Sequence, residues 1–460
     1  MQLTILLATL LILTVIGFHM GRSRAVSTAV SGIGHLNSLP SYYGIYVAVW
    51  CGVPAGVVLI LWLLFEPQVV ETLVVAGLPE AARTLPENKL DLLLNDIRNL
   101  AVGNIVSRDV DPEMQRAADH YASIRRMGGA AMIGVVLALA VAGIGFGRKA
   151  ISPELRARTR IENVLMVFLI GCSTIAILTT VGIVLSLLFE SLRFFQLVSP
   201  VEFLFGLEWS PQTALREDQV GSSGLFGSVP LLAGTALISF IAMCVAVPVG
   251  LLSAIYMSEY AASKVRSAVK PLLEILAGIP TVVYGFFAAL TVAPFFRESG
   301  NLFGIGISSE SALAGGLVMG IMIIPFVSSI SDDVISAVPQ SLREGSLGLG
   351  ATKSETIRRV ILPAALPGIV GGILLAVSRA IGETMIVVMA AGLAANLTAN
   401  PLEAVTTVTV QIVTLLVGDQ EFDSAKTLAA FALGLVLFFI TLILNVAALS
   451  VVKKYREQYE

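Results

Sequence analysis

Long uninterrupted runs of apolar residues constrain the fold of this 460-residue chain more than any other feature. A membrane-spanning helix needs about 20 consecutive, predominantly apolar residues. Runs without Asp, Glu, Lys or Arg that reach about this length lie at residues 1–21, 25–65, 127–147, 163–189, 220–258, 275–296, 311–331, 360–378 and 427–452. The pattern therefore predicts an all-α membrane protein with about nine transmembrane helices.

The composition excludes several other classes of protein. Charged residues make up 13% of the chain, whereas soluble domains carry about 25%. The net charge of −3 provides no basic surface for nucleic acid. The three cysteines lie in apolar stretches, and the three histidines lack the spacing of metal ligands. We therefore expect neither an ordinary soluble enzyme nor a metal site.

The distribution of basic residues orients the helices. With the N-terminus outside, the segments expected in the cytoplasm, such as 148–162 and 332–360, hold most of the Lys and Arg residues. The first apolar run has no basic start and no small-residue cleavage site, which favours a retained helix over a signal peptide. We expect the N-terminus outside and the C-terminus in the cytoplasm.

The chain divides into two predicted parts. Residues 1–150 form an N-terminal extension with three transmembrane helices and a long outside loop, residues 66–126. Residues 151–460 form a core with the other six helices. The outside loop is expected to fold, because apolar residues recur in it at helical spacing, namely Leu90, Leu93, Leu94, Ile97 and Leu100.

A polar segment before the eighth apolar run predicts a cytoplasmic elbow over residues 332–363. Gly350 can adopt positive φ and end a first helix. Thr352 and Glu355 have the spacing of a capping box that starts a second helix. Pro363 is expected to end that helix, because proline cannot continue the helical hydrogen bonds. Such an elbow suits docking into a cleft of a soluble partner, and an ordinary helical loop is the alternative.

Arg379 and Glu383 are charges within an apolar region, with about 19 uncharged residues on either side. A charge at mid-membrane costs about 2.5–3.5 kcal/mol on insertion scales and is usually paired or functional. The i,i+4 spacing would place both on one helix face, where they could satisfy each other. A structural ion pair is therefore one interpretation.

An anion site is the other interpretation. A guanidinium suits bidentate contact with a tetrahedral oxyanion. A neighbouring carboxylate would accept a hydrogen bond from a protonated anion and repel a fully ionised one. Phosphate keeps a proton at neutral pH, whereas sulfate does not. An anion site formed by Arg379 and Glu383 is therefore predicted to select phosphate over sulfate.

Several motifs resemble those of a known family. The pattern of Glu344, Gly350, Val360, Leu362 and Pro363 resembles the EAA loop of ABC-importer permeases, and in that family this loop is the coupling helix. Three stretches resemble the PstC family of phosphate-specific ABC-importer permeases, over about residues 160–456: Ser228–Tyr260, Leu272–Gly285, and the elbow continuing into Arg379–Thr384.

The resemblance implies an ABC-importer permease core within residues 151–460. It assigns coupling to the ATPase to Glu344, Gly350, Leu362 and Pro363. It assigns phosphate passage to Arg379 and Glu383, and we add Thr384 to the expected substrate contacts.

The resemblance also implies the partners. It predicts a subunit of an ATP-driven importer of inorganic phosphate in a bacterial cytoplasmic (inner) membrane. The expected partners are a second homologous permease, a dimer of ATP-hydrolysing subunits, an extracytoplasmic phosphate-binding protein and membrane lipid. We expect no catalytic residue and no cofactor in this chain, since ATP and Mg would be bound by the ATPase.

The sequence is compatible with more than one role for several residues. Glu274, Pro280 and Tyr284 could line the pathway or form a gate. Alternatively, Glu274 could pair with a lipid headgroup or with Lys270. The rival functions are a permease for another oxyanion (sulfate or molybdate), a secondary transporter, or an intramembrane enzyme. The extension could be a packing element or a contact for the binding protein or a regulatory partner.

Overall fold

The computed structural model describes residues 2–28, 36–79, 86–103, 111–213, 223–304, 306–308, 310–417 and 424–456. They form two compact units, Met1–Leu178 and Thr179–Glu460. Within the described residues, eight helices are long and apolar enough to cross a membrane, and the count reaches nine if a bent helix pair is one span. The predicted all-α membrane fold is therefore confirmed.

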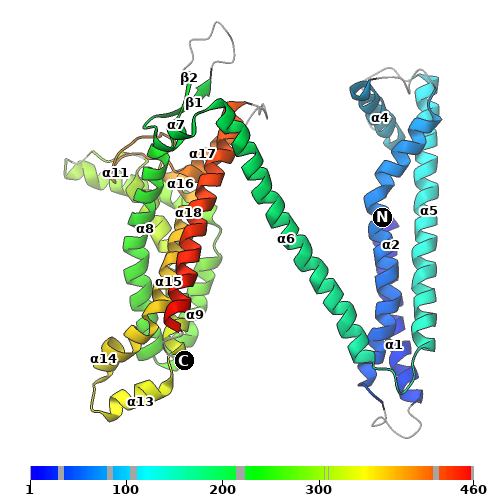
Figure 1. The fold of residues 1–460 in the computed structure, drawn as a ribbon, viewed down its shortest axis with the longest axis horizontal. Helices are drawn as coiled ribbons and strands as arrows, with labels where there is room; N and C mark the ends of the chain where they lie inside the picture. Colours follow the sequence, from blue (N-terminus) through cyan, green and yellow to red (C-terminus); the bar gives the residue numbers. More distant parts are fainter. Residues whose placement is uncertain are drawn as a thin grey trace. The chain divides into compact units, whose positions relative to one another are not determined.

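The first unit is built from long helices (Figure 1). Its elements are α1 (Gln2–Thr28), α2 (Pro40–Gly77), α4 (Glu87–Val102) and α5 (Pro112–Lys149), followed by the first part of α6 (Ala157–Leu197). The boundary with the second unit lies inside α6, between Leu178 and Thr179, whereas the sequence prediction places a domain boundary after residue 150.

Helices α1, α2 and α5 pack together in this unit. The contact between α2 and α5 is close at Gly143, where an added Cβ would collide with the carbonyl group of Trp50. Helix α2 has 38 residues and is therefore about 57 Å long, whereas the hydrocarbon core of a bilayer is about 30 Å thick. Part of α2 must extend beyond the membrane.

The predicted outside loop 66–126 is largely helical where the structure describes it. It contains the end of α2, all of α4 and the start of α5. Ile97 is fully buried in a small core with Val74 and Ala118, and Leu90, Leu93, Leu94 and Leu100 pack against this core. The helical spacing of these residues is thus confirmed. Residues 80–85 and 104–110 of this loop lie outside the described residues.

The second unit contains the rest of α6 and the remaining elements (Figure 1). Helix α7 (Pro200–Phe205) precedes a short β-hairpin. The hairpin consists of β1 (Trp209–Thr213) and β2 (Ser223–Phe226). The strands are antiparallel, with Trp209 opposite Phe226 and Ser210 opposite Leu225.

The helices after the hairpin are α8 (Val229–Ile255), α9 (Ser263–Gly278), α10 (Thr281–Phe287), α11 (Ala293–Leu302), α12 (Ala312–Ala337), α13 (Gln340–Gly348), α14 (Lys353–Thr356), α15 (Leu362–Ile381), α16 (Met385–Ala390), α17 (Val408–Leu416) and α18 (Ala425–Arg456). Three π-helical turns join consecutive helices, at Tyr256–Tyr260, Ala288–Val292 and Ile357–Ile361.

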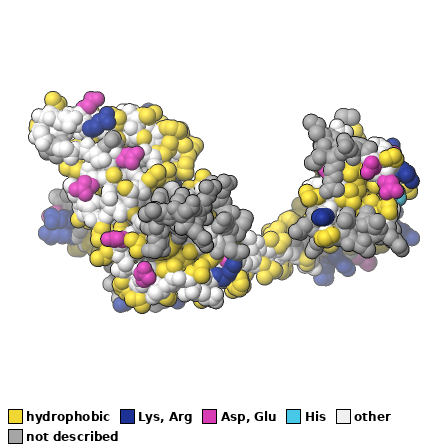
Figure 2. Space-filling model, turned by 90° about the horizontal axis from the view of Figure 1, so that it is seen from above, with side chains coloured by type: hydrophobic (Ala, Val, Ile, Leu, Met, Phe, Trp, Pro, Cys, Tyr) yellow, Lys and Arg dark blue, Asp and Glu magenta, His cyan; other side chains and the backbone are white. Residues whose placement is uncertain are grey.

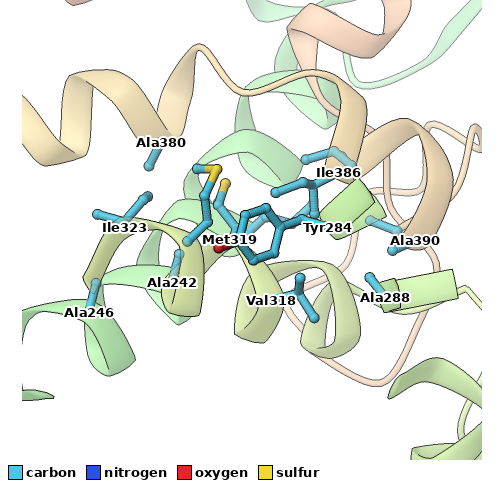
Figure 3. Close-up of a cluster of buried hydrophobic side chains, with 14 of the residues drawn as sticks. Ala242, Ala246, Tyr284, Ala288, Val318, Met319, Ile323, Ala380, Ile386 and Ala390 are labelled. Atoms are coloured by element: carbon cyan, nitrogen blue, oxygen red, sulfur yellow. The ribbon is translucent and has the colours of Figure 1, made fainter. Parts of the chain in front are cut away.

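Helices α8 and α12 pack along each other in the centre of the second unit. Small residues allow this close approach, as at Gly316, where an added Cβ would lie 2.8 Å from Cβ of Ile241. Helix α15 contacts α12 on one side and α18 on another. Tyr284 lies in the resulting core among Met319, Ile386 and Val318 (Figure 3).

Many large apolar side chains are exposed along the helices, and hydrophobic side chains are also widespread on the face shown in Figure 2. Val167 and Phe168 on α6, for example, are exposed. In water such a continuous apolar surface would be unfavourable, but in a bilayer it faces lipid or another apolar helix. The exposed surface therefore agrees with the membrane assignment.

The predicted span 275–296 is not one straight helix. Helix α9 ends at Gly278, α10 begins at Thr281, and the two are bent by 86°. Proline disfavours helical backbone in the preceding residue, and Ile279 is accordingly extended, with φ −67° and ψ 129°. The helix is thus completely broken before α10, at Ile279 and Pro280.

Candidate functional site

Arg379 lies in the last turn of α15. Its guanidinium carbon lies 5.4 Å from the ring centre of Phe326 on α12, in a cation–π contact. The side chain is exposed in this subunit. No ion pair joins Arg379 to another residue that the structure describes, so its charge is available to another molecule.

Glu383 does not share a helix with Arg379, and this corrects the prediction from their i,i+4 spacing. Helix α15 ends at Ile381, and the chain passes through Gly382, Glu383 and Thr384 before α16 begins. Gly382 favours this ending because glycine loses more backbone freedom in a helix than other residues do.

Hydrogen bonds of Glu383 and Thr384 stabilise the break between α15 and α16. The Oε1 atom of Glu383 accepts hydrogen bonds from the backbone N–H groups of Met385, at 3.1 Å, and Ile386, at 3.5 Å. The Thr409 hydroxyl donates to the Glu383 carbonyl at 2.8 Å. The Thr384 hydroxyl donates to the Gly382 carbonyl at 3.4 Å. Glu383 and Thr384 therefore shape the break between α15 and α16.

The two charges have separate partners. The guanidinium of Arg379 lies over the Phe326 ring, and the first N–H groups of α16 bind the carboxylate of Glu383. An ion pair between Arg379 and Glu383 is absent from the described contacts, because the carboxylate is directed to the backbone of α16.

A cavity of about 190 Å³ lies beside Arg379. Its walls come from α9, α12 and α15, together with Met257. The polar side chains that line it are Lys270, Glu274, Ser328, Ser329, Asp332 and Arg379. Of the predicted pathway residues, the cavity thus includes Arg379 and Glu274 but not Glu383, Thr384, Pro280 or Tyr284.

Asp332 closes one side of this cavity within a salt-bridge network. Its side chain is 1% exposed. Nη2 of Arg266 donates to both of its carboxylate oxygens at 3.0 Å, and Nζ of Lys270 donates to Oδ2 at 3.2 Å. A buried carboxylate needs such partners. Lys270 therefore pairs with Asp332 and not with Glu274, contrary to the suggestion from sequence spacing.

Tyr284 connects the two arms of the broken helix. Its ring is buried, and its hydroxyl donates to the carbonyl of Leu276 at 3.0 Å. Leu276 lies in the last turn of α9, where backbone carbonyls lack helical partners. The geometry therefore gives Tyr284 a structural part in the break at Pro280.

The elbow has the predicted helix–turn–helix form. Helix α13 is followed by Gly350, which has φ +87°. The predicted capping box is present, since Thr352 Oγ1 accepts from the Glu355 N–H and the Glu355 carboxylate accepts from the Thr352 N–H. The elbow lies at the end of the second unit opposite β1 and β2 (Figure 1).

The prediction that Pro363 ends the second helix is wrong. The helical path continues from Lys353 to Ile381. A π-helical turn, Ile357–Ile361, precedes Pro363 and changes the hydrogen-bond register. Pro363 then stands in the first turn of α15, where a missing N–H removes no helical hydrogen bond.

Polar contacts connect the elbow to the ends of α8 and α12. Arg343 Nη1 donates to Glu259 Oε1 at 2.8 Å, and its Nη2 donates to the Ile335 carbonyl at 2.6 Å. Lys353 Nζ lies 5.1 Å from the centre of the Tyr260 ring. A displacement of the elbow would therefore pull on both helices.

The predicted coupling residues have different environments. Glu344, Gly350 and Pro363 are exposed, whereas Leu362 is half-buried against the core at the base of the elbow. Leu349, which the sequence reasoning missed, is 91% exposed at the tip. An apolar residue so exposed next to a tight turn is a sequence signal that could have identified it.

Ser328 and Asp332 were also missed as parts of the site. Ser328 lies in a glycine- and serine-rich apolar helix that offers no distinctive motif, and the sequence predicts Asp332 at the start of the cytoplasmic elbow. Only the packing of α9 and α15 against α12 brings them beside Arg379.

Two family models match the chain. One, described as a phosphate ATP-binding cassette transporter, matches residues 7–179. The other, described as a binding-protein-dependent transport system inner membrane component, matches residues 246–457. The second match includes the elbow and the Arg379 cavity.

Three relatives give the same assignment. The probable ABC transporter permease protein YqgH of Bacillus subtilis is 34% identical over 276 residues, covering 59% of this chain and 84% of the relative. The phosphate transport system permease protein PstC 1 of Mycobacterium tuberculosis is 34% identical over 279 residues, covering 55% and 82%. PstC of Haemophilus influenzae is 35% identical over 176 residues, covering 35% and 53%.

The fold and these matches define a multi-pass permease subunit of an ABC transporter. More narrowly, the chain belongs to the PstC family of phosphate transport permeases, and it carries an N-terminal extension before the region shared with these relatives.

Proposed function

We propose that this chain is the permease subunit of an ATP-driven importer of inorganic phosphate, with Arg379 as its main anion contact. The observation that carries the proposal is an exposed guanidinium beside a cavity in the membrane-spanning bundle, without an ion-pair partner among the described residues. The names of the relatives support phosphate as the anion.

Phosphate would pass along the exposed side of Arg379. A guanidinium offers several N–H donors in a plane and suits the oxygens of a tetrahedral anion. A second, homologous permease would cover this side and complete the pathway. An extracytoplasmic binding protein would deliver phosphate, with the N-terminus of this chain outside and its C-terminus in the cytoplasm of a bacterial inner-membrane system.

The elbow would couple transport to ATP hydrolysis in a partner dimer, which would bind the ATP and Mg. Glu344 and the exposed Leu349 would enter a groove of the ATPase, and Gly350 would keep the turn between them and α14 tight. Leu362 and Pro363 at the base would pass the movement to α15, which carries Arg379. The chain itself would perform no catalysis.

The test is ATP-dependent uptake of radiolabelled phosphate by the chain co-expressed with its ATPase, second permease and binding protein. We expect Arg379→Ala to abolish uptake and Arg379→Lys to retain part of it. Arg297→Ala is the matched control, because Arg297 is also an exposed arginine of the second unit but lies outside the Arg379 cavity. Each variant is compared at equal membrane abundance.

Competition assigns the substrate. Excess sulfate and molybdate should leave phosphate uptake unchanged. Normal uptake by Arg379→Ala would reject the site, and equal competition by sulfate or molybdate would assign another oxyanion to the same permease. Uptake that continues without ATP hydrolysis would indicate a secondary transporter.

A further inference from the structure

Among the polar groups that line the Arg379 cavity, Glu274 and Ser328 have no role in the proposed function and no ion-pair or hydrogen-bond partner of their side chains among the described residues. We infer that Glu274, rather than Glu383, is the carboxylate that accepts the proton of phosphate, and that the Ser328 hydroxyl is a further phosphate contact. This inference rests on the proposed function, because it names contacts of the same anion site.

The Glu383 carboxylate is already engaged elsewhere. One of its oxygens accepts from two backbone N–H groups of α16, and Glu383 does not line the cavity. A carboxylate in this role determines how the chain leaves α15. Because Glu383 has this positioning role and lies outside the cavity, we expect the acceptor of the substrate's proton among the carboxylates that line the cavity.

Glu274 is such a carboxylate. It lies in the penultimate turn of α9, lines the same cavity as Arg379 and is exposed in this subunit. Its i−4 neighbour, Lys270, is directed to Asp332 at 3.2 Å and to Asp333 at 3.5 Å. Within the described part of the chain, Glu274 has no ion-pair partner. An ionised carboxylate can only accept hydrogen bonds.

Ser328 provides an independent observation. The residue is 0% exposed, it lines the cavity, and its Oγ atom has no hydrogen-bond partner among the residues that the structure describes. Most buried polar atoms in native proteins are hydrogen-bonded, so an unsatisfied one requires an explanation. Ser328 lies two residues after Phe326, the ring beneath the Arg379 guanidinium. A phosphate oxygen in the cavity would supply the missing partner.

The three groups together select a protonated oxyanion. Arg379 only donates, Ser328 can donate or accept, and Glu274 only accepts. Monohydrogen phosphate presents one O–H donor and several acceptor oxygens, so each group can be satisfied. Sulfate presents acceptors alone at neutral pH and would face Glu274 with an unpaired, like-charged oxygen. A site built around one hydrogen bond strongly rejects a ligand that lacks the matching group.

The experiment measures phosphate uptake by the co-expressed complex at increasing sulfate concentrations. Glu274→Gln keeps the size of the side chain but adds an N–H₂ donor, which can bind a sulfate oxygen. Sulfate should leave wild-type uptake unchanged, and we expect it to half-inhibit Glu274→Gln at a concentration about tenfold or more below the highest one that wild type tolerates. Glu383→Gln should produce no such gain of sulfate inhibition.

Ser328→Ala has a matched control in Ser239→Ala. Ser239 is also buried, and its hydroxyl has no partner in the described part of the chain, but it lies on α8 against a separate cavity without charged lining residues. We expect Ser328→Ala to raise the KM for phosphate several-fold, and Ser239→Ala to leave it unchanged. Both substitutions remove one oxygen atom, so a general effect on packing would move the two variants together.

The outcomes separate this inference from the proposed function. If Arg379→Ala abolishes uptake while Glu274→Gln rejects sulfate as wild type does, the permease site stands and the role of Glu274 is refuted. Equal KM values for Ser328→Ala and Ser239→Ala would refute the role of Ser328. Normal transport by Arg379→Ala would instead refute the proposed function.

Discussion

The ion pair between Arg343 and Glu259 should decide whether the elbow stays attached to the bundle. Arg343 belongs to α13, and Glu259 belongs to the π-helical turn that follows α8. Their Nη1 and Oε1 atoms are 2.8 Å apart, and the side chains are only 15% and 9% exposed. Arg343 also donates to the carbonyl of Ile335 at the end of α12. Truncating Arg343 would therefore release two contacts at once.

The magnitude follows from the burial of the pair. Removing one partner of a buried ion pair leaves the other charge without compensation and costs about 3–5 kcal/mol. Replacing both partners by apolar groups of similar size is often neutral. We therefore expect Arg343→Met to destabilise the second unit by about 3 kcal/mol or more. The double variant Arg343→Met with Glu259→Met should recover most of this loss.

The assay is thermal unfolding of the purified protein in detergent, followed by the fraction that remains monodisperse after heating. At about 2–4 °C per kcal/mol, the midpoint of Arg343→Met should fall by about 6 °C or more. Arg358→Met is the control, because Arg358 is an exposed arginine of the same elbow. A double variant as unstable as the sum of its single variants would refute the coupling, as would an unchanged midpoint for Arg343→Met.

Two further predictions concern packing and the broken helix. Gly143→Val should destabilise the first unit by about 1–3 kcal/mol, since its side chain would meet the Trp50 backbone, whereas Gly145→Val on the same helix enters open space; detergent melting curves of the two variants test this difference. Tyr284→Phe should cost about 0.5–1.5 kcal/mol by losing the hydrogen bond to Leu276 and should retain phosphate uptake. A stable Tyr284→Phe protein without uptake would assign this residue to the gate instead.

The features that could be predicted from sequence are those set by local patterns. The length of apolar runs identifies membrane helices because a bilayer imposes a minimum span. The spacing of Thr352 and Glu355 identified a capping box that the structure contains, and Ile97 identified the buried face of a helix in the outside segment. Each of these signals depends on residues within a few positions of one another.

The predictions that were wrong concern contacts between distant segments of the chain. The end of α15 is stabilised by the hydroxyl of Thr409, far along the chain from the Glu383 carbonyl that it contacts. Asp332 finds its two basic partners on α9, a separate helix. Spacing within one helix suggested Arg379 as the partner of Glu383 and Glu274 as the partner of Lys270. In the folded chain Glu383 instead binds the backbone of α16, and Lys270 binds Asp332.

The break after α15 explains how a charge can remain available inside a membrane bundle. The guanidinium of Arg379 lies over the ring of Phe326 on α12, and the carboxylate of Glu383 accepts from the N–H groups that start α16. Had α15 continued through Glu383, the i,i+4 arrangement would have paired the two side chains and satisfied both charges. Because the helix ends first, the Glu383 carboxylate accepts hydrogen bonds from the backbone of α16, and Arg379 keeps no ion-pair partner among the described residues, as the proposed anion contact requires.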